Sequence, residues 1–249
     1  CFGHFPEGFE GAFPPPGWVR FDNGIGTAQS WNSTTTPTLV RTGAQAAYLN
    51  REAVAVGTTA LDWLVTPQVL VPANGQLRFY TKLTQAGDQG SVYTIRISTA
   101  TQNTTTDFTV VKTWNELQIM SLDDLGNDGS TLPIQSTYIQ KKVNLSAYAG
   151  QNVYIAFVMA NNNGDRWCVD DVNLDQQCLV NTALTAAPLG TSAILNWTSS
   201  SAGPWEIEYG PAGFVQGTGT IVSAATKPFT LTPLLPVAAY SYFVRSICS

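Results

Sequence analysis

Two adjacent carboxylates, Asp170 and Asp171, stand inside a segment that otherwise has the composition of a buried strand, Trp167 to Leu174. Side chains that follow one another in a strand point to opposite faces. Strict alternation places Asp170 on one face with Cys168 and Val172, and places Asp171 on the other, so one aspartate points into the protein. A buried carboxylate is costly unless it is paired or bound to a metal. The pair therefore predicts a nearby cation.

Catalytic chemistry is poorly supported by the remaining residues. The chain has one histidine, His4, and it contains neither a Gly-x-Ser-x-Gly elbow nor a His-Glu-x-x-His helix. Glycoside hydrolysis needs two carboxylates that face each other, whereas Asp170 and Asp171 diverge. His4 with Cys1 or Cys168 is the alternative nucleophile pair, but we expect these cysteines in disulfides. The sequence predicts a protein that is not an enzyme.

Composition and charge limit the possible partners. Of the 249 residues 12% are charged, whereas an average domain has about 25%. Such a low charged fraction is typical of extracellular β proteins. The net charge of −5 argues against nucleic acid as a partner. No apolar run is long enough to span a membrane. The chain begins at Cys1 without a signal peptide, and we interpret it as a processed piece of a longer secreted protein.

Helical periodicity is almost absent, and short apolar or alternating runs separated by Gly, Asn and Pro turns predict an all-β fold. About eight strands precede residue 178, and this number with long loops favours a jelly-roll sandwich. The expected strands cover residues 46–50, 63–71, 76–83, 91–98, 107–113, 138–145, 152–159 and 167–174. The first predicted domain is therefore residues 1–178.

The pattern changes to much shorter strands in residues 179–249, the second predicted domain. Trp197 lies on an early strand, Trp205 to Gly210 alternates, and Tyr240 follows a Leu-Pro turn. These features predict a small immunoglobulin-like sandwich. The segment holds two basic and two acidic residues, a net charge of zero, so we interpret it as an inert spacer.

The four cysteines are Cys1, Cys168, Cys178 and Cys248, and no two of them form the C-x-x-C spacing of a zinc site. We expect two disulfides, as is usual in exported proteins. Cys178 and Cys248 bracket the second domain, so we pair them; closing such a loop stabilises a fold by about 4 kcal/mol in the chain-entropy model. Cys1 and Cys168 form the remaining pair. In the alternative both are free, with Cys168 as a small core residue.

Residues 179–249 resemble a fibronectin type III domain. The resemblance rests on Leu195-Asn196-Trp197, on the strand Glu206 to Gly210, and on Leu235-Pro236 ahead of Tyr240. The bracketing cysteines match a common bacterial variant. Because such modules are widely used as spacers, the resemblance implies a fold and no activity.

Residues 1–178 resemble the cleaved adhesin or choice-of-anchor J family, a relative by architecture of the MAM domain and of calcium-containing carbohydrate-binding modules. The matching stretches are Phe9 to Trp18, Ala47 to Arg51, Asp62 to Pro67, Val143 to Phe157 and Trp167 to Val172. The family occurs in secreted and surface bacterial proteins, usually as one module of a longer chain exported by the type IX route.

The resemblance also implies that the first strand lies beside the last. Glu10 would then approach Asp170 and Asp171, and Asp22 would arrive from the next loop. Carboxylates that converge in this way repel one another unless a cation lies among them, and their hard oxygens suit Ca²⁺. We therefore predict a structural calcium ion, with Arg166 as the alternative counter-ion.

One departure weakens that site. Many family members carry Asp-x-Asp-Gly-Asp-Gly after the Gly-Trp, whereas this chain has Asp22-Asn23-Gly24-Ile25-Gly26, with a single carboxylate.

The function that these observations favour is adhesion at a bacterial cell surface, through a glycan or an extracellular protein. The alternatives are an accessory targeting module of a secreted protease or glycosidase, and a structural spacer in a surface filament. Sugar rings stack on exposed aromatic side chains, and the chain has seven tryptophans. Trp63, Trp167 and Trp197 have strand patterns that predict burial. The pattern does not decide the exposure of Trp31, Trp114 and Trp205.

Overall fold

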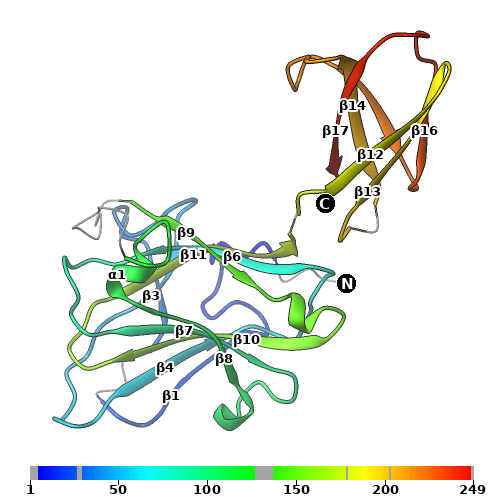
Figure 1. Cartoon of the computed structure of the whole chain (residues 1–249). Helices are drawn as coiled ribbons and strands as arrows, with labels where there is room; N and C mark the ends of the chain where they lie inside the picture. The colour runs from blue at the N-terminus through cyan, green and yellow to red at the C-terminus, as the bar shows by residue number, and fades with distance from the viewer. Residues whose placement is uncertain (1–4, 27–29, 127–136, 178, 202, 248–249) are drawn as a thin grey trace. The chain divides into compact units, whose positions relative to one another are not determined.

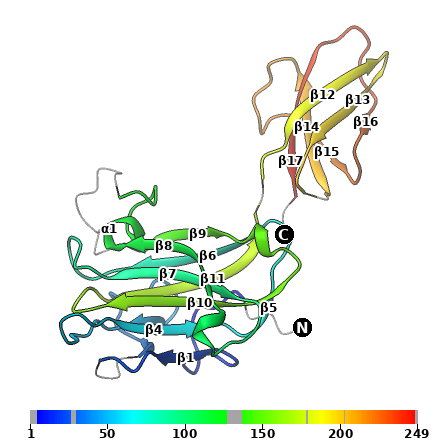
Figure 2. The ribbon, with the colours of Figure 1, turned by 60° about the horizontal axis from the view of Figure 1, so that its bottom comes forward.

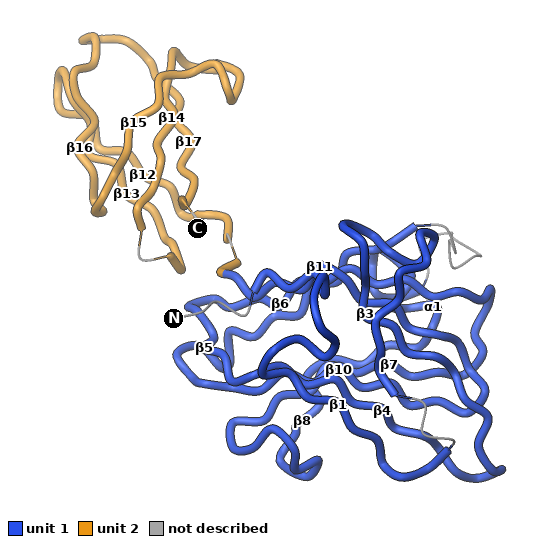
Figure 3. The backbone as a smooth tube through the Cα atoms, turned by 180° about the vertical axis from the view of Figure 1, so that it is seen from behind, with its two compact units in different colours: residues 1–175 blue, residues 176–249 orange. Residues whose placement is uncertain are grey.

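The computed structural model describes residues 5–26, 30–126, 137–177, 179–201 and 203–247. The chain forms two compact units, residues 1–175 and residues 176–249 (Figure 3). Nearly all of its regular structure is β (Figure 1), which confirms the predicted fold class. The helical elements are single turns: α1 (Glu116–Ile119), η1 (Thr105–Asp107) and η2 (Ser146–Tyr148). No helix in the described part of the chain has the length and apolar character that a membrane crossing requires.

Unit 1 is a sandwich of two sheets, which appear as two layers in Figure 1 and overlap in the view of Figure 2. The first sheet runs in the order β1 (Val19–Asp22), β4 (Ala60–Val65), β10 (Asn152–Asn161), β7 (Val92–Ser98) and β8 (Thr109–Asn115), and β5 (Val69–Leu70) pairs with β10. The second runs β2 (Asn32–Thr34), β3 (Ala46–Leu49), β11 (Trp167–Gln176), β6 (Gly75–Lys82) and β9 (Ile139–Asn144). All eight predicted strand regions contain strand.

Aromatic side chains fill the space between the two sheets. Trp167 lies at the centre, with its ring centroid 5.0 Å from that of Tyr93 and 5.1 Å from that of Trp31. All seven tryptophans of the chain are buried. The undecided Trp31, Trp114 and Trp205 are therefore core residues, because the apolar area of an indole ring stabilises a core strongly.

Strand β11 departs from strict alternation at Asp171, whose φ of 48° lies in the left-handed region. Before this point Trp167 and Val169 face the core, and after it Val172 does. The prediction that Val172 shares a face with Asp170 is therefore wrong. Asp170 is fully buried, but it lies beneath the Arg41–Thr42 backbone rather than among the core side chains.

Unit 2 has three strands in each of two sheets. One sheet contains β12 (Thr182–Leu189), β13 (Ser192–Thr198) and β16 (Phe229–Leu231), and the other contains β15 (Thr220–Ala224), β14 (Trp205–Pro211) and β17 (Tyr240–Ser246). Trp197 and Trp205 meet in its core with ring centroids 5.4 Å apart. At one edge, every residue of β12 is exposed, and its pairing with β13 shifts register between Thr182 and Thr185.

Candidate functional sites

Asp170 is held by the backbone of the loop that precedes β3. Its Oδ2 accepts the N–H of Arg41 at 3.0 Å and that of Thr42 at 3.3 Å, and its Oδ1 accepts the N–H of Asp171 at 2.8 Å. Burial raises the pKa of Asp170 to about 6, and the N–H donors of the loop oppose the rise. Backbone dipoles therefore solvate this carboxylate in place of water.

Asp171 and Glu10 reach the same loop from either side. Asp171 forms an ion pair with Arg41 and accepts the Thr42 hydroxyl at 2.7 Å. Glu10 Oε2 accepts the N–H of Ala44 at 2.8 Å. The structure thus brings Glu10, Asp170 and Asp171 together, as expected.

The counter-ion of this group is Arg41, whose guanidinium carbon also lies 3.3 Å from the centroid of the Tyr80 ring. Arg166 donates instead to Asn50 at 3.0 Å and to Thr84 at 3.3 Å. The alternative that paired Arg166 with the two aspartates is therefore wrong. Sequence proximity to Asp170 suggested Arg166, whereas the loop that folds across β11 supplies Arg41 from a distant position.

Asp22 does not join this group. It ends β1, directly opposite Asp62 on β4, and its Oδ1 accepts the N–H of Gly24 at 2.6 Å. The expected set of four carboxylates is thus divided between the two sheets, because Asp22 belongs to the first sheet and Asp170 to the second.

Asp62, which the site prediction missed, is the most unusual carboxylate of unit 1. It is fully buried, and neither of its side-chain oxygens accepts a hydrogen bond from any residue that the structure describes. Burial raises its pKa to about 7, and the nearby charges of Glu52 and Asp22 raise it further. Like charges directly opposite each other on paired strands are destabilising. The sequence signal was a charged residue within an apolar strand.

Glu52 lies near Asp62, and Asn161 holds the backbone of Glu52. Glu52 is 5% exposed, and Asn161 Oδ1 accepts its backbone N–H at 3.2 Å. A Cβ on Gly26 would lie 2.3 Å from Glu52 Oε2, so the loop backbone passes directly over that carboxylate. In the described part of the chain, no three His, Cys, Asp or Glu side chains are already placed as ligands of one metal ion.

Cys168 is a free thiol, and it is fully buried. Burial raises its pKa to about 12. The structure therefore has Cys168 as a core residue and not in the expected bridge to Cys1, because the β11 strand packs it away from solvent. Cys1, Cys178 and Cys248, like His4, lie outside the described residues, and the Cys178–Cys248 pairing stays a prediction.

The fold and these loops define unit 1 as a β-sandwich module in which two acidic groups tie loops to the sheets. Its residues 4–174 match the family model of the Cleaved Adhesin Domain. The chain belongs to the Cleaved Adhesin Domain family. The predicted resemblance of residues 1–178 to this family is thereby confirmed. The resemblance of residues 179–249 to fibronectin type III stays a prediction.

One protein sequence and two solved structures are similar to parts of this chain. Hemagglutinin A of Porphyromonas gingivalis is 32% identical over 177 residues, which are 67% of this chain and 6% of that protein. The K1 cleaved adhesin domain of Lys-gingipain from P. gingivalis W83 has a TM-score of 0.48 at 18% identity, over 69% of this chain and 96% of that one. The module TmCBM61, solved with β-1,4-galactotriose, has a TM-score of 0.42 at 14% identity, over 68% and 94%.

Proposed function

We propose that the chain is a non-catalytic part of a longer bacterial surface or secreted protein and attaches that protein to a glycan or an extracellular protein. The family match, which spans unit 1 almost from end to end, carries this proposal. The name of the relative in P. gingivalis supports a role in binding cells.

The surface of unit 1 that best suits a ligand is the loop from Thr35 to Ala44. A hollow of about 550 Å³ opens there, and Thr35, Pro37, Val40 and Arg41 line it with the backbone of Gly43. Contacts from below hold the loop, since Lys82 Nζ donates to Thr38 O at 2.5 Å and Tyr138 Oη to Leu39 O at 2.6 Å. A rigid loop binds with a smaller loss of conformational entropy than a mobile one.

Binding of the purified full chain to erythrocytes, to a glycan array and to immobilised fibronectin, collagen and fibrinogen tests the adhesive function. We expect saturable binding to at least one of these, and weaker binding by the double variant Thr35→Ala and Thr42→Ala. Val56→Ala, on a fully exposed side chain elsewhere in unit 1, is the matched control. Absence of all binding at 100 µM protein contradicts adhesion and favours the spacer. A targeting role within a protease or glycosidase predicts the same binding, and the parent gene separates the two.

We also propose that Ca²⁺ is a structural ion of unit 1 and that Asp62 is its central ligand. The support is the buried Asp62 carboxylate, whose oxygens have no donor, together with Asp22 and Glu52 beside it. Calcium takes six to eight oxygens, so backbone carbonyls, the Asn161 amide oxygen and water would supply the rest. Such an ion would neutralise the Asp62 carboxylate, whose two oxygens accept no hydrogen bond from the residues that the structure describes.

The group of Glu10, Asp170 and Asp171 is the second position for calcium. Its oxygens already accept backbone N–H groups, and Arg41 already neutralises Asp171. An ion there would have to displace the Arg41 guanidinium. Elemental analysis of the purified chain and melting curves with and without a chelator test both positions. A metal-free protein whose melting temperature does not respond to Ca²⁺ contradicts the calcium proposal altogether.

A further inference from the structure

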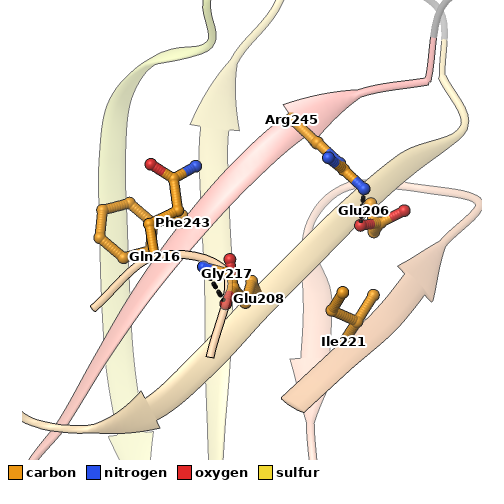
Figure 4. A pocket seen from close by; sticks show the side chains of 7 residues that line it. All are labelled: Glu206, Glu208, Gln216, Gly217, Ile221, Phe243 and Arg245. Carbon is orange, nitrogen blue, oxygen red and sulfur yellow. Dashed lines mark hydrogen bonds and ion pairs between the residues drawn. The ribbon is translucent and has the colours of Figure 1, made fainter. Parts of the chain in front are cut away.

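A shallow hollow of about 250 Å³ lies on the outer face of the sheet formed by β15, β14 and β17 in unit 2 (Figure 4). Its floor consists of Glu206 and Glu208 on β14, flanked by Phe243 and Arg245 on β17 and by Ile221 on β15. The loop between β14 and β15 forms one wall, with Gln216 and Gly217. This surface lies outside residues 4–174, which the family match covers.

The hollow exposes apolar surface on a sheet face that would ordinarily be polar. Phe243 is 37% exposed and Ile221 is 55% exposed. Among the aromatic side chains that the structure describes, Phe243 is the only exposed one. Phe214 packs edge-on against it with ring centroids 5.4 Å apart, so the ring is held in place while one face stays open.

Polar groups with fixed positions surround this ring. Glu208 Oε1 accepts the N–H groups of Gly217 and Gly219, both at 2.7 Å, which fixes the carboxylate and the loop together. Glu206 is ion-paired with Arg245 (Figure 4). The hollow therefore presents carboxylate acceptors, a guanidinium and the Gln216 amide beside the apolar surface of Phe243 and Ile221. Small-molecule sites have this composition, with apolar walls and a few convergent polar groups.

A hexopyranose ring matches this arrangement. One face of the ring carries C–H groups that stack on an aromatic side chain, and its edge carries hydroxyls that donate to carboxylates and accept from amides and guanidinium. The hollow has one more carboxylate than it has cations, so it disfavours sialic and uronic acids. We propose that unit 2 binds a neutral hexopyranose residue of a glycan at this site, which makes unit 2 a second contact and not an inert spacer.

The test is ¹⁵N NMR of the full chain titrated with cellotriose, mannotriose and N-acetylglucosamine trisaccharide, with digalacturonate and sialyllactose as acidic probes. We expect the amides of Gly217, Gly219 and Phe243 to shift with at least one neutral probe, at a millimolar or tighter Kd, and with neither acidic probe. Phe243→Ala should weaken binding at least tenfold. Glu208→Gln should weaken it severalfold, and its amide oxygen can still accept from Gly217 and Gly219. Leu235→Ala, on an exposed loop of the same unit, should bind as the unchanged chain does.

Three results overturn the proposal: no shift at these amides with any neutral probe at 20 mM, full affinity in the Phe243→Ala variant, or equal binding of acidic probes. Shifts confined to unit 1 also overturn it, while they leave the adhesive function of unit 1 intact. If cell binding is absent while these three amides still shift, the adhesive function is contradicted and the glycan site of unit 2 is supported.

Discussion

Two of the buried aspartates of unit 1, Asp170 and Asp62, have different surroundings, and the contrast shows how a fold accommodates a negative charge. Asp170 and Asp62 are both fully shielded from solvent. Three backbone N–H groups point at Asp170, whereas Asp62 has no donor among the described residues and lies beside two other carboxylates. Burial raises both pKa values, to about 6 for Asp170 and to about 7 for Asp62. Asp170 is thus solvated by backbone N–H groups of the chain itself. Asp62 lacks such groups, and in our proposal a bound Ca²⁺ neutralises it.

The largest effect should follow from Asp170→Ala. The substitution leaves the part-buried N–H groups of Arg41 and Thr42 without their acceptor, at a cost of about 3 kcal/mol, or about 6 to 12 °C in the melting temperature of unit 1. Calorimetry of the full chain measures it. Asp170→Asn keeps an acceptor oxygen and should lose about half as much. Equal stability of the alanine variant and the unchanged chain would remove the distinction between the two aspartates.

Calcium should stabilise unit 1 by binding at Asp62 and not at Asp170. At a free concentration of 100 times its Kd, an ion that binds only the folded chain stabilises it by about 2.7 kcal/mol, so a chelator should lower the melting temperature by several degrees. The loss should disappear in Asp62→Asn and persist in Asp171→Asn. The reverse pattern would place the ion at the Arg41–Ala44 loop, and it would refute the assignment to Asp62.

In calcium-free buffer at pH 8 the two asparagine substitutions should have opposite signs. Asp62→Asn removes a buried charge and its repulsion from Asp22 and Glu52, so it should stabilise unit 1 by about 1 kcal/mol. Asp170→Asn should destabilise it. Urea unfolding measures both, and Asp22→Asn, on an exposed side chain, is the control with the smaller gain. Destabilisation by Asp62→Asn without calcium would show that its carboxylate has partners after all.

The smallest effect concerns the Cys168 thiol. The rate at which it is alkylated measures how often β11 and the Arg41–Ala44 loop over it open. Because burial raises the pKa of Cys168 to about 12, almost none of it is thiolate at pH 8. Mass spectrometry after iodoacetamide treatment should find it unlabelled in the folded chain and slowly labelled in Asp170→Asn. Asp62→Asn should leave the rate unchanged. A Cys168 that resists labelling even after unfolding, until a reductant is added, would instead support the bridge to Cys1.

The sequence predicted the strand positions in unit 1 because turns rich in Gly, Asn and Pro separate its short apolar runs. Runs of this kind are buried in the core of a β-sandwich. The approach of Glu10 to Asp170 and Asp171 also followed, from the family resemblance. The opposition of Asp22 and Asp62 did not, since it depends on the register of β1 against β4, and residues 40 apart in the chain carry no sign of their pairing. Likewise, the sequence from Tyr240 to Arg245 predicts a strand, but the periodicity of its apolar residues does not predict that the Phe243 ring faces solvent.

The exposed edge strand β12 affects whether neighbouring copies of unit 2 can associate when they are packed densely. A strand with a free edge is a template on which another chain can add. In β12, Pro188 lacks the N–H that such pairing needs, and the register shift between Thr182 and Thr185 breaks the straight edge. Many copies of unit 2 packed at high density on one surface would therefore stay separate, without coalescing into a shared sheet.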